Sequence, residues 1–286
     1  MIGLKERDIK KMNYNQLISV IGETNRPPGG IRTVINFANN VGLRKEHKVL
    51  EIGTSTGFTA IELAKMVGCK ITAIDINEDS LKIATSNSES YGVRENIKFI
   101  CADAMDLPFE DGEFDFVFAG NVISYIPNRE KALQEYKRVL KDNGVLFVTP
   151  MFYLERPSRN LMERIRDSLK MDIQVDYEDY WDSFFNIDGL DVYLTERYKF
   201  DYITDQHIRE YVEDILKTNE SVLSQNITDV DSLEYFKELY TNYIYLYRDN
   251  LFKMAYKEIY ARKSEFAFDR ELFTSTKMKE MIINGC

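Results

Sequence analysis

Two acidic residues and a run of small residues have the spacing of a nucleotide pocket in this 286-residue chain. One apolar segment has Glu51 near its end, a turn rich in small residues follows it, and a second apolar segment ends at Asp75. Small residues let the backbone turn tightly and approach a ligand, and an acid about 20 residues further on can bind both ribose hydroxyls. The residues predicted to form this pocket are Glu51, Gly53, Thr54, Ser55, Gly57 and Asp75.

The same turn also matches Gly-x-Ser-x-Gly, the motif that presents a nucleophilic serine in α/β-hydrolases. A hydrolase needs an acid and a histidine after the serine, and only His207 follows, inside a predicted helix. This interpretation also expects several strands before the turn and gives Asp75 no role. A serine hydrolase that uses Ser55 remains an alternative.

The elements that must position these residues alternate between short apolar and amphipathic segments from residue 48 to 150. The predicted strands are 48–52, 70–74, 97–101, 114–119 and 144–149. The predicted helices are 57–67, 78–91 and 129–140. This alternation is typical of an α/β fold with a mostly parallel sheet, in which the loops after the strands share one edge.

The chain divides into four predicted regions: cap helices at 1–46, a binding core at 47–150, an aromatic helical lid at 151–265, and a final strand and tail at 266–286. Prolines and glycines predict a loop at 22–30. Fourteen of the 18 tyrosines lie between 153 and 260. This region should hold one strand, at 192–203, and be helical from 205 to about 263, and a last strand is predicted at 266–276.

The net charge and composition limit the kinds of partner that the protein is expected to bind. The formal net charge is −10, which argues against a nucleic-acid substrate because such binding needs clustered basic residues. Three dispersed cysteines, a charged start and the lack of a long apolar run favour a cytoplasmic protein without a membrane segment. The oligomeric state is left open.

From 48 to 150 the sequence resembles the class I S-adenosylmethionine-dependent methyltransferases. The motifs that carry the resemblance, in the family's order, are 49–57, Asp75, 101–104, 114–121 and 138–146. The resemblance implies a Rossmann-like, doubly wound, mostly parallel sheet of seven strands, with N-terminal cap helices and a C-terminal helical lid. It also implies S-adenosylmethionine as cofactor, S-adenosylhomocysteine as product, and a small-molecule methyl acceptor.

The resemblance assigns the first motifs to the methionine and ribose parts of the cofactor. The loop 53–57, together with Glu51, would hold the methionine part. Asp75 would bind the ribose hydroxyls, and Ile76 would pack on the adenine ring. Arg26 and Arg32 could pair with the cofactor carboxylate, or they could be ordinary surface arginines.

The later motifs are assigned in the same way to adenine and to the methyl group. Asp103 would accept a hydrogen bond from the adenine amino group, and the amide of Ala104 would meet a ring nitrogen. Gly120 lies at the substrate end of the fourth strand. Gly29 and Gly30 belong to a Pro-Pro-Gly-Gly loop that resembles one which some members fold over the methionine end.

The predicted catalytic residues are Asn121 and Tyr125, in the loop after the fourth strand. Many small-molecule members have a histidine near this position, and this chain has none, so a histidine base is excluded there. Methyl transfer depends mainly on alignment, and it needs a base only when the acceptor must lose a proton of high pKa.

An acidic, aromatic segment at 171–196 suggests an amine acceptor, since carboxylates and ring faces attract ammonium groups, although such a run of charge is more often a solvated face. Acceptors at oxygen or carbon, and cofactor binding without methyl transfer, remain alternatives. No metal is expected, because four acids that cluster locally have no ligand partners; they are Asp176, Glu178, Asp179 and Asp182.

Overall fold

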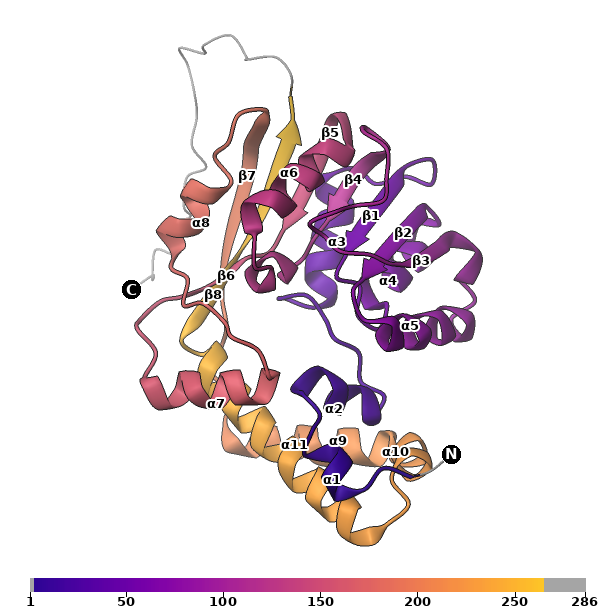
Figure 1. The fold of residues 1–286 in the computed structure, drawn as a ribbon, viewed down its shortest axis with the longest axis vertical. Helices are drawn as coiled ribbons and strands as arrows, with labels where there is room; N and C mark the ends of the chain where they lie inside the picture. The colour runs from indigo at the N-terminus through magenta and orange to yellow at the C-terminus, as the bar shows by residue number, and fades with distance from the viewer. Residues whose placement is uncertain (1–2, 265–286) are drawn as a thin grey trace, which may run out of the picture.

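The computed structural model describes residues 3–264, and the strands of this part form one eight-stranded sheet (Figure 1). The strands are β1 (Lys48–Ile52), β2 (Lys70–Asp75), β3 (Ile97–Cys101), β4 (Phe114–Phe118), β5 (Leu140–Val148), β6 (Met151–Tyr153), β7 (Leu190–Lys199) and β8 (Met254–Lys263). Their order is β3-β2-β1-β4-β5-β8-β6, and β7 also pairs with β8. The order reverses between β1 and β4, where open α/β sheets bind their ligands.

The first five strands are parallel to one another, whereas β5, β6 and β7 each pair antiparallel with β8. The helices of the described residues are α1 (Glu6–Ile9), α2 (Tyr14–Val20), α3 (Ile31–Asn40), α4 (Phe58–Val67), α5 (Glu78–Ser90), α6 (Arg129–Val139), α7 (Arg159–Leu169), α8 (Glu178–Phe184), α9 (Asp205–Thr218), α10 (Glu220–Asn226) and α11 (Val230–Leu251). Two short 3₁₀ helices, η1 (Arg94–Asn96) and η2 (Val122–Tyr125), follow α5 and β4.

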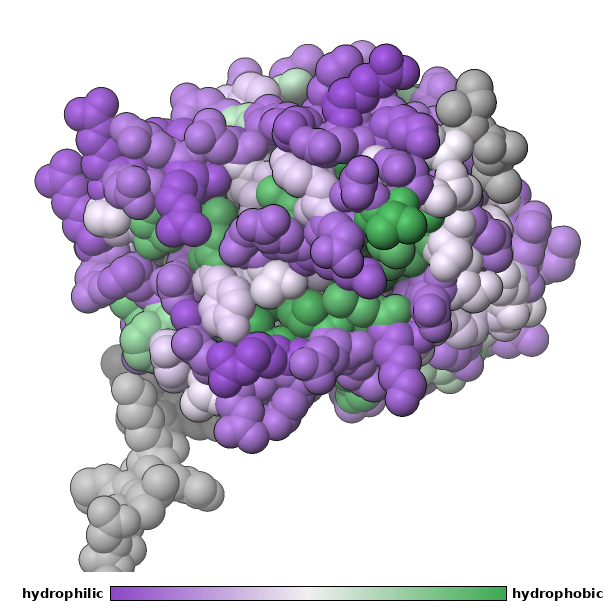
Figure 2. All heavy atoms as spheres, turned by 90° about the horizontal axis from the view of Figure 1, so that it is seen from below, coloured by the Kyte–Doolittle hydropathy of each residue, from purple (hydrophilic) through white to green (hydrophobic). Residues whose placement is uncertain are grey.

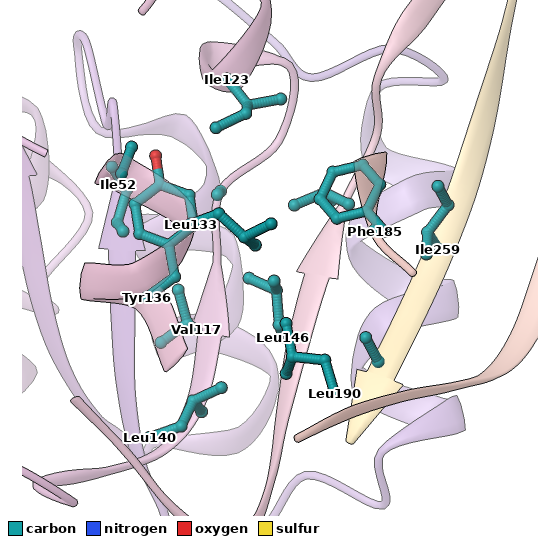
Figure 3. Close-up of a cluster of buried hydrophobic side chains, with 14 of the residues drawn as sticks. Ile52, Val117, Ile123, Leu133, Tyr136, Leu140, Leu146, Phe185, Leu190 and Ile259 are labelled. Carbon is teal, nitrogen blue, oxygen red and sulfur yellow. The ribbon is translucent and has the colours of Figure 1, made fainter. Parts of the chain in front are cut away.

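Each face of the sheet is covered by its own set of helices. Side chains of α3 and α4, including the fully buried Phe37, pack with β1, β2, β4 and β5 on one face. On the other face, α6 and α8 pack Tyr136 and Phe185 into a second cluster with Leu146 (Figure 3). Burial of these apolar side chains is what drives the layers together.

Six helices form a separate layer beyond the carboxyl edge of the parallel strands (Figure 1). These outer helices are α1, α2, α7, α9, α10 and α11. All of them except α7 share a core that includes Ile9, Leu17, Ile208 and Phe236, so segments far apart in the sequence pack together. Helix α7 packs on α11 through Leu161 and Leu246. Figure 2 shows a mostly hydrophilic outer face with smaller hydrophobic areas between the charged side chains. Within residues 3–264 no helix combines the length and apolar character needed to span a bilayer.

The five strands and three helices predicted within 48–150 are confirmed, with small changes at their ends. The predicted strand at 192–203 is β7, and the loop at 22–30 is also confirmed. The prediction of seven strands was too low. Residues 151–263 contribute three strands to the sheet rather than the single strand expected.

The prediction that the helical pattern continues to about residue 263 was wrong, because residues 254–263 form β8. This segment contains alanine, lysine and glutamate, which favour helices locally. Strands β5, β6 and β7 all pair with it, and most of it is buried. Sheet pairing and burial therefore override its local preference. The strand predicted at 266–276 lies outside the described residues.

Candidate active site

The turn after β1 is bonded to the end of β2. The backbone N–H groups of Gly53 and Thr54 both donate to the Ile74 carbonyl at 2.9 Å, and that of Ser55 donates to Oδ2 of Asp75 at 2.8 Å. The N–H of Asn77 donates to Oδ1 of the same carboxylate at 2.9 Å. Each carboxylate oxygen keeps a further lone pair for a ligand. The structure thus brings the predicted turn and the predicted ribose-binding acid together.

Two positions of this turn require glycine. Gly53 has φ of +75°, and a Cβ there would lie 2.7 Å from Cγ2 of Val122 at the start of η2. Gly57 has φ of +91°, and a Cβ there would lie 3.1 Å from that of Ala84 in α5. The turn is therefore held closely between the loops of the neighbouring elements.

The carboxylate of Glu51 is hydrogen-bonded to other groups of the protein. Its buried carboxylate accepts hydrogen bonds from Oγ1 of Thr54 at 2.6 Å and from the N–H of Ala60 at 3.1 Å. Burial raises the pKa of Glu51 to about 7, although these hydrogen bonds oppose the shift. Through these hydrogen bonds, Glu51 connects the turn after β1 to α4.

The loops after β2 and β3 lie side by side next to this turn. The N–H of Ala102 donates to the Asp75 carbonyl at 3.1 Å. Ile76 is 75% exposed, which is unusual for a large apolar side chain beside a binding edge and leaves its surface open to a flat ligand. Asp103 accepts from the N–H of Met105 at 2.8 Å, and Ala104 is half-buried next to it.

Asn121 ties the loop after β4 to β6. Its Oδ1 accepts from Oγ of Ser124 at 2.7 Å and from the N–H of Met151 at 3.0 Å. Gly120 precedes it with φ of +47°, and its carbonyl accepts from Thr149 at 2.7 Å. A Cβ at Gly120 would lie 4.0 Å from Cβ of Pro27, so the proline–glycine loop reaches this edge too.

Tyr125 lies in η2 at the same edge. It is 42% exposed, yet desolvation by the surrounding atoms raises its pKa, while the side chain of Asn121 acts in the opposite direction. The phenol stays protonated at neutral pH, so it can donate a hydrogen bond but cannot act as a base.

Two tyrosines, one from β6 and one from α11, lie near Tyr125. The pKa values of Tyr153 and Tyr247 are both raised, mainly by burial and in part by Tyr125. The hydroxyl of Tyr153 donates to Oδ1 of Asn250 at 2.8 Å, and that of Tyr247 lies 2.9 Å from Oγ of Ser168. These tyrosines were not predicted residue by residue; the tyrosine enrichment of 153–260 was their only signal.

A buried ion pair that the sequence did not reveal supports Tyr125. Nη1 and Nη2 of Arg129 lie 3.0 and 2.8 Å from the two carboxylate oxygens of Asp176. Nη2 of Arg129 also donates to the carbonyl of Ser124 at 2.8 Å, next to Tyr125. The guanidinium lies over the rings of Tyr180 and Trp181.

The acidic segment 171–196 therefore does not present a set of free carboxylates. Besides the Asp176 pair, Lys257 lies within ion-pair distance of Glu178 at 3.0 Å and of Asp182 at 2.5 Å. Basic residues from distant parts of the chain neutralise these acids, which a reading of the segment alone could not show. Among residues 3–264, no group of three potential ligands has the geometry of a metal site.

The proline–glycine loop is anchored to α3 and β8. Oγ1 of Thr33 donates to the carbonyl of Pro28 at 2.5 Å, and a Cβ at Gly29 would lie 2.3 Å from the hydroxyl of Tyr256. Gly30 precedes α3 with φ of +61°. The two arginines that flank the loop have partners in the protein: Arg26 lies over the ring of Phe58, and Arg32 donates to Tyr256.

The histidines do not form a hydrolase site with Ser55. His207 is exposed in the first turn of α9, and its N–H donates to Oγ1 of Thr204. His47 lies before β1, packs on Phe116, and accepts from the N–H of Arg44 at 3.0 Å. In the described part of the chain, neither histidine is hydrogen-bonded to Ser55.

Comparisons with known proteins agree with this geometry. The profile of the family described as "Methyltransferase domain" matches residues 50–148. An uncharacterized protein of Haemophilus influenzae is 33% identical over 177 residues, which cover 61% of this chain and 70% of that protein. Demethylmenaquinone methyltransferase of Staphylococcus aureus is 32% identical over 148 residues, covering 48% of this chain and 60% of that enzyme.

A solved structure has a similar fold over most of the chain. It is the phosphoethanolamine N-methyltransferase 2 of Haemonchus contortus, in complex with S-adenosyl-L-methionine. The TM-score is 0.67 at 16% identity, with 91% of this chain and 57% of that chain covered. The likeness concerns the fold, and it extends beyond the residues matched by the family profile.

Proposed function

The chain belongs to the class I S-adenosylmethionine-dependent methyltransferases, and from this premise we propose that it methylates an amine nitrogen of a small molecule. The outer helices would cover the acceptor, and the loops after β1 to β4 would hold the cofactor. The observation that carries the proposal is the position of Tyr125, with Tyr153 and Tyr247 near it, next to Asn121 at the point where the strand order reverses. We infer that these tyrosines line a recess for the acceptor.

The residues of the carboxyl edge fit S-adenosylmethionine. Asp75 has acceptor capacity left for a ribose diol, Ile76 leaves an apolar surface open for adenine, and Asp103 lies in the adjacent loop. The turn at Gly53 lets the backbone approach the methionine part. The bound cofactor supplies an electrophilic methyl group on a sulfonium. The protein must orient the acceptor and keep competing water away.

The recess favours an acceptor that needs no base from the protein. In the described part of the chain no histidine is bonded to Asn121 or Tyr125, and Asp176 is already paired with Arg129. A neutral amine can attack directly, whereas most alcohols must first lose a proton. The rings of Tyr125, Tyr153 and Tyr247 would stabilise the positive charge that develops on the nitrogen.

The test is transfer of a labelled methyl group from S-adenosylmethionine to a panel of small amines, phenols and carboxylates, with the products identified by mass spectrometry. Label on nitrogen supports the proposal. Label on oxygen or carbon would keep the enzyme class and reject the amine. Tight binding of S-adenosylhomocysteine with no transfer to any acceptor or metabolite extract would indicate a binding protein instead.

A Tyr125→Phe variant tests the role of the recess. Loss of one hydrogen bond to the acceptor should lower kcat/KM about tenfold. The affinity for S-adenosylhomocysteine should not change, because the phenol lies on the acceptor side. A Ser55→Ala variant serves as a control for the hydrolase alternative: the proposal expects no reaction of wild-type Ser55 with a fluorophosphonate.

A further inference from the structure

A cavity lies at the amino edge of the sheet, at the opposite ends of the strands from the candidate active site. It has a volume of about 600 Å³ and is lined by the beginnings of β1, β2, β3 and β4 and by the loop that leads into β4. Since β2 has six residues, about 17 Å along the strand separates its first residue, Lys70, from Asp75.

The cavity exists because part of one sheet face has no helix over it. Helix α6 covers this face at β4 and β5, whereas a loop crosses in front of β1 to β3 (Figure 1). The loop is held in place, since Arg138 donates to the carbonyls of Leu107 at 2.9 Å and Phe109 at 2.7 Å. The ring of Phe109 packs edge-on against that of Phe114. The apolar wall is therefore formed in advance of any ligand.

Basic side chains gather on this face of the sheet. Lys48 and Lys70 are direct neighbours across β1 and β2, and Lys98 is the neighbour of Thr72 across β2 and β3. Because side chains alternate along a strand, all three lysines point to the same side. Like charges on paired positions destabilise a sheet, so this row carries a cost unless an anion lies against it.

The lysines are available for a ligand. Lys48, Lys70 and Lys98 are all exposed. Lys70 donates to the carbonyl of Glu95 at 3.0 Å, and within residues 3–264 the ammonium groups of Lys48 and Lys98 have no hydrogen-bond or ion-pair partner. With Arg94, the lining holds four basic and two acidic residues, an excess of two positive charges. The chain as a whole carries −10, so the local excess runs against the overall charge.

We propose that this cavity binds a small phosphorylated metabolite, with the phosphate on the lysine row and an apolar or aromatic part against Phe109. A row of three ammonium groups suits a doubly charged phosphate better than a single carboxylate. The site is distinct from the cofactor pocket and does not depend on the proposed acceptor.

The test uses ADP as the probe and calorimetry on the full chain saturated with S-adenosylhomocysteine, so that the nucleotide pocket at Asp75 is filled. ADP should bind to the saturated protein, and pyrophosphate should bind more weakly because it lacks the aromatic part. Binding should weaken as salt is raised. The double variant Lys48→Gln and Lys98→Gln should lose affinity for ADP about tenfold or more, because each lysine removed is a charge-assisted contact.

The matched control is Lys11→Gln with Lys217→Gln, which changes the net charge equally at exposed positions, one just after α1 and one in α9. It should bind ADP like the wild type. No binding of ADP, displacement of ADP by S-adenosylhomocysteine, or an equal loss in both double variants would each overturn the proposal. Failure of the wild type to bind S-adenosylhomocysteine would instead contradict the proposed function. In that case, the difference in ADP affinity between the two double variants would still test the lysine row.

Discussion

The backbone N–H of Ser55 donates a 2.8 Å hydrogen bond to Oδ2 of Asp75, which joins the turn after β1 to the end of β2. The same carboxylate accepts from Asn77 through its other oxygen. One acid therefore shapes the turn and still offers both oxygens to a ligand. Through these two hydrogen bonds, Asp75 and the turn form one structural unit.

Replacing Asp75 with asparagine should weaken the binding of S-adenosylhomocysteine about 10- to 100-fold, because hydrogen bonds from the ribose to a charged acceptor are lost. The fold should persist, since the asparagine oxygen can still accept from Ser55. Calorimetry measures the affinity, and the exposed Asp79→Asn is the control, because Asp79 pairs with Lys82 at the surface. Unchanged affinity in the Asp75 variant would contradict the assignment of the ribose site.

Gly53→Ala should be more damaging than Gly42→Ala. Both glycines have positive φ, of +75° and +58°, but only at Gly53 would a Cβ meet another side chain, Val122. The alanine at 42 should lower the free energy of unfolding by about 1 kcal/mol, from the left-handed backbone alone. The alanine at 53 should cost more and should also weaken cofactor binding.

Urea unfolding of both glycine variants measures these differences. Adding Val122→Ala to Gly53→Ala should restore part of the lost stability, because it removes the close contact but leaves the backbone strain. If the two single variants are equally destabilised, the close approach of Gly53 to η2 has no energetic weight.

Glu51 should make stability depend on pH. Burial raises its pKa in the folded state to about 7, above the ordinary value of 4.5. Between these values the folded state holds more protons than the unfolded state, so the Glu51 contribution to stability declines as pH rises from about 4.5 to about 7. For one proton the slope cannot exceed about 1.4 kcal/mol per pH unit.

The measurement is urea unfolding of the wild type and Glu51→Gln at pH 5 and pH 7.5. The amide cannot titrate, so the variant should gain stability relative to the wild type as the pH is raised. A difference in free energy that is the same at both pH values would show that the Glu51 carboxyl does not titrate in this window.

Breaking the ion pair between Arg129 and Asp176 should destabilise the protein and disturb Tyr125. Arg129→Met leaves a buried carboxylate without its partner, which typically costs about 3–5 kcal/mol. Pairing it with Asp176→Asn should cost less than the sum of the two single variants. Unfolding experiments on the full double-mutant cycle give the coupling energy.

The same variants should affect the acceptor more than the cofactor, since Arg129 bonds to the Ser124 carbonyl beside Tyr125. In variants that still fold, KM for the acceptor should rise while the affinity for S-adenosylhomocysteine stays close to that of the wild type. Equal losses for both ligands would mean that the pair supports the fold in general rather than the recess.

Much of the carboxyl edge of the parallel strands could be predicted because its sequence signals are local. Gly53, Asp75 and the five core strands lie in short segments whose composition dictates a turn, a strand end or an apolar strand, and parallel topology brings those ends together. Strand β8 could not be predicted in this way, because its residues favour a helix until β5, β6 and β7 pair with it. The acidic segment 171–196 likewise suggested free carboxylates, because its basic partners Arg129 and Lys257 lie in other parts of the chain.

The sequence alone determined the fold class, the family and the cofactor, since these depend on motifs whose residues are close along the chain. Only the tertiary structure decided what lies around Tyr125 of η2: it brought Tyr247 of α11 near Tyr125 and paired Asp176 with Arg129. These contacts join residues 47 or more positions apart. Their partners are selected by burial and chain topology rather than by local preference, which is why the pattern of the sequence could not specify them.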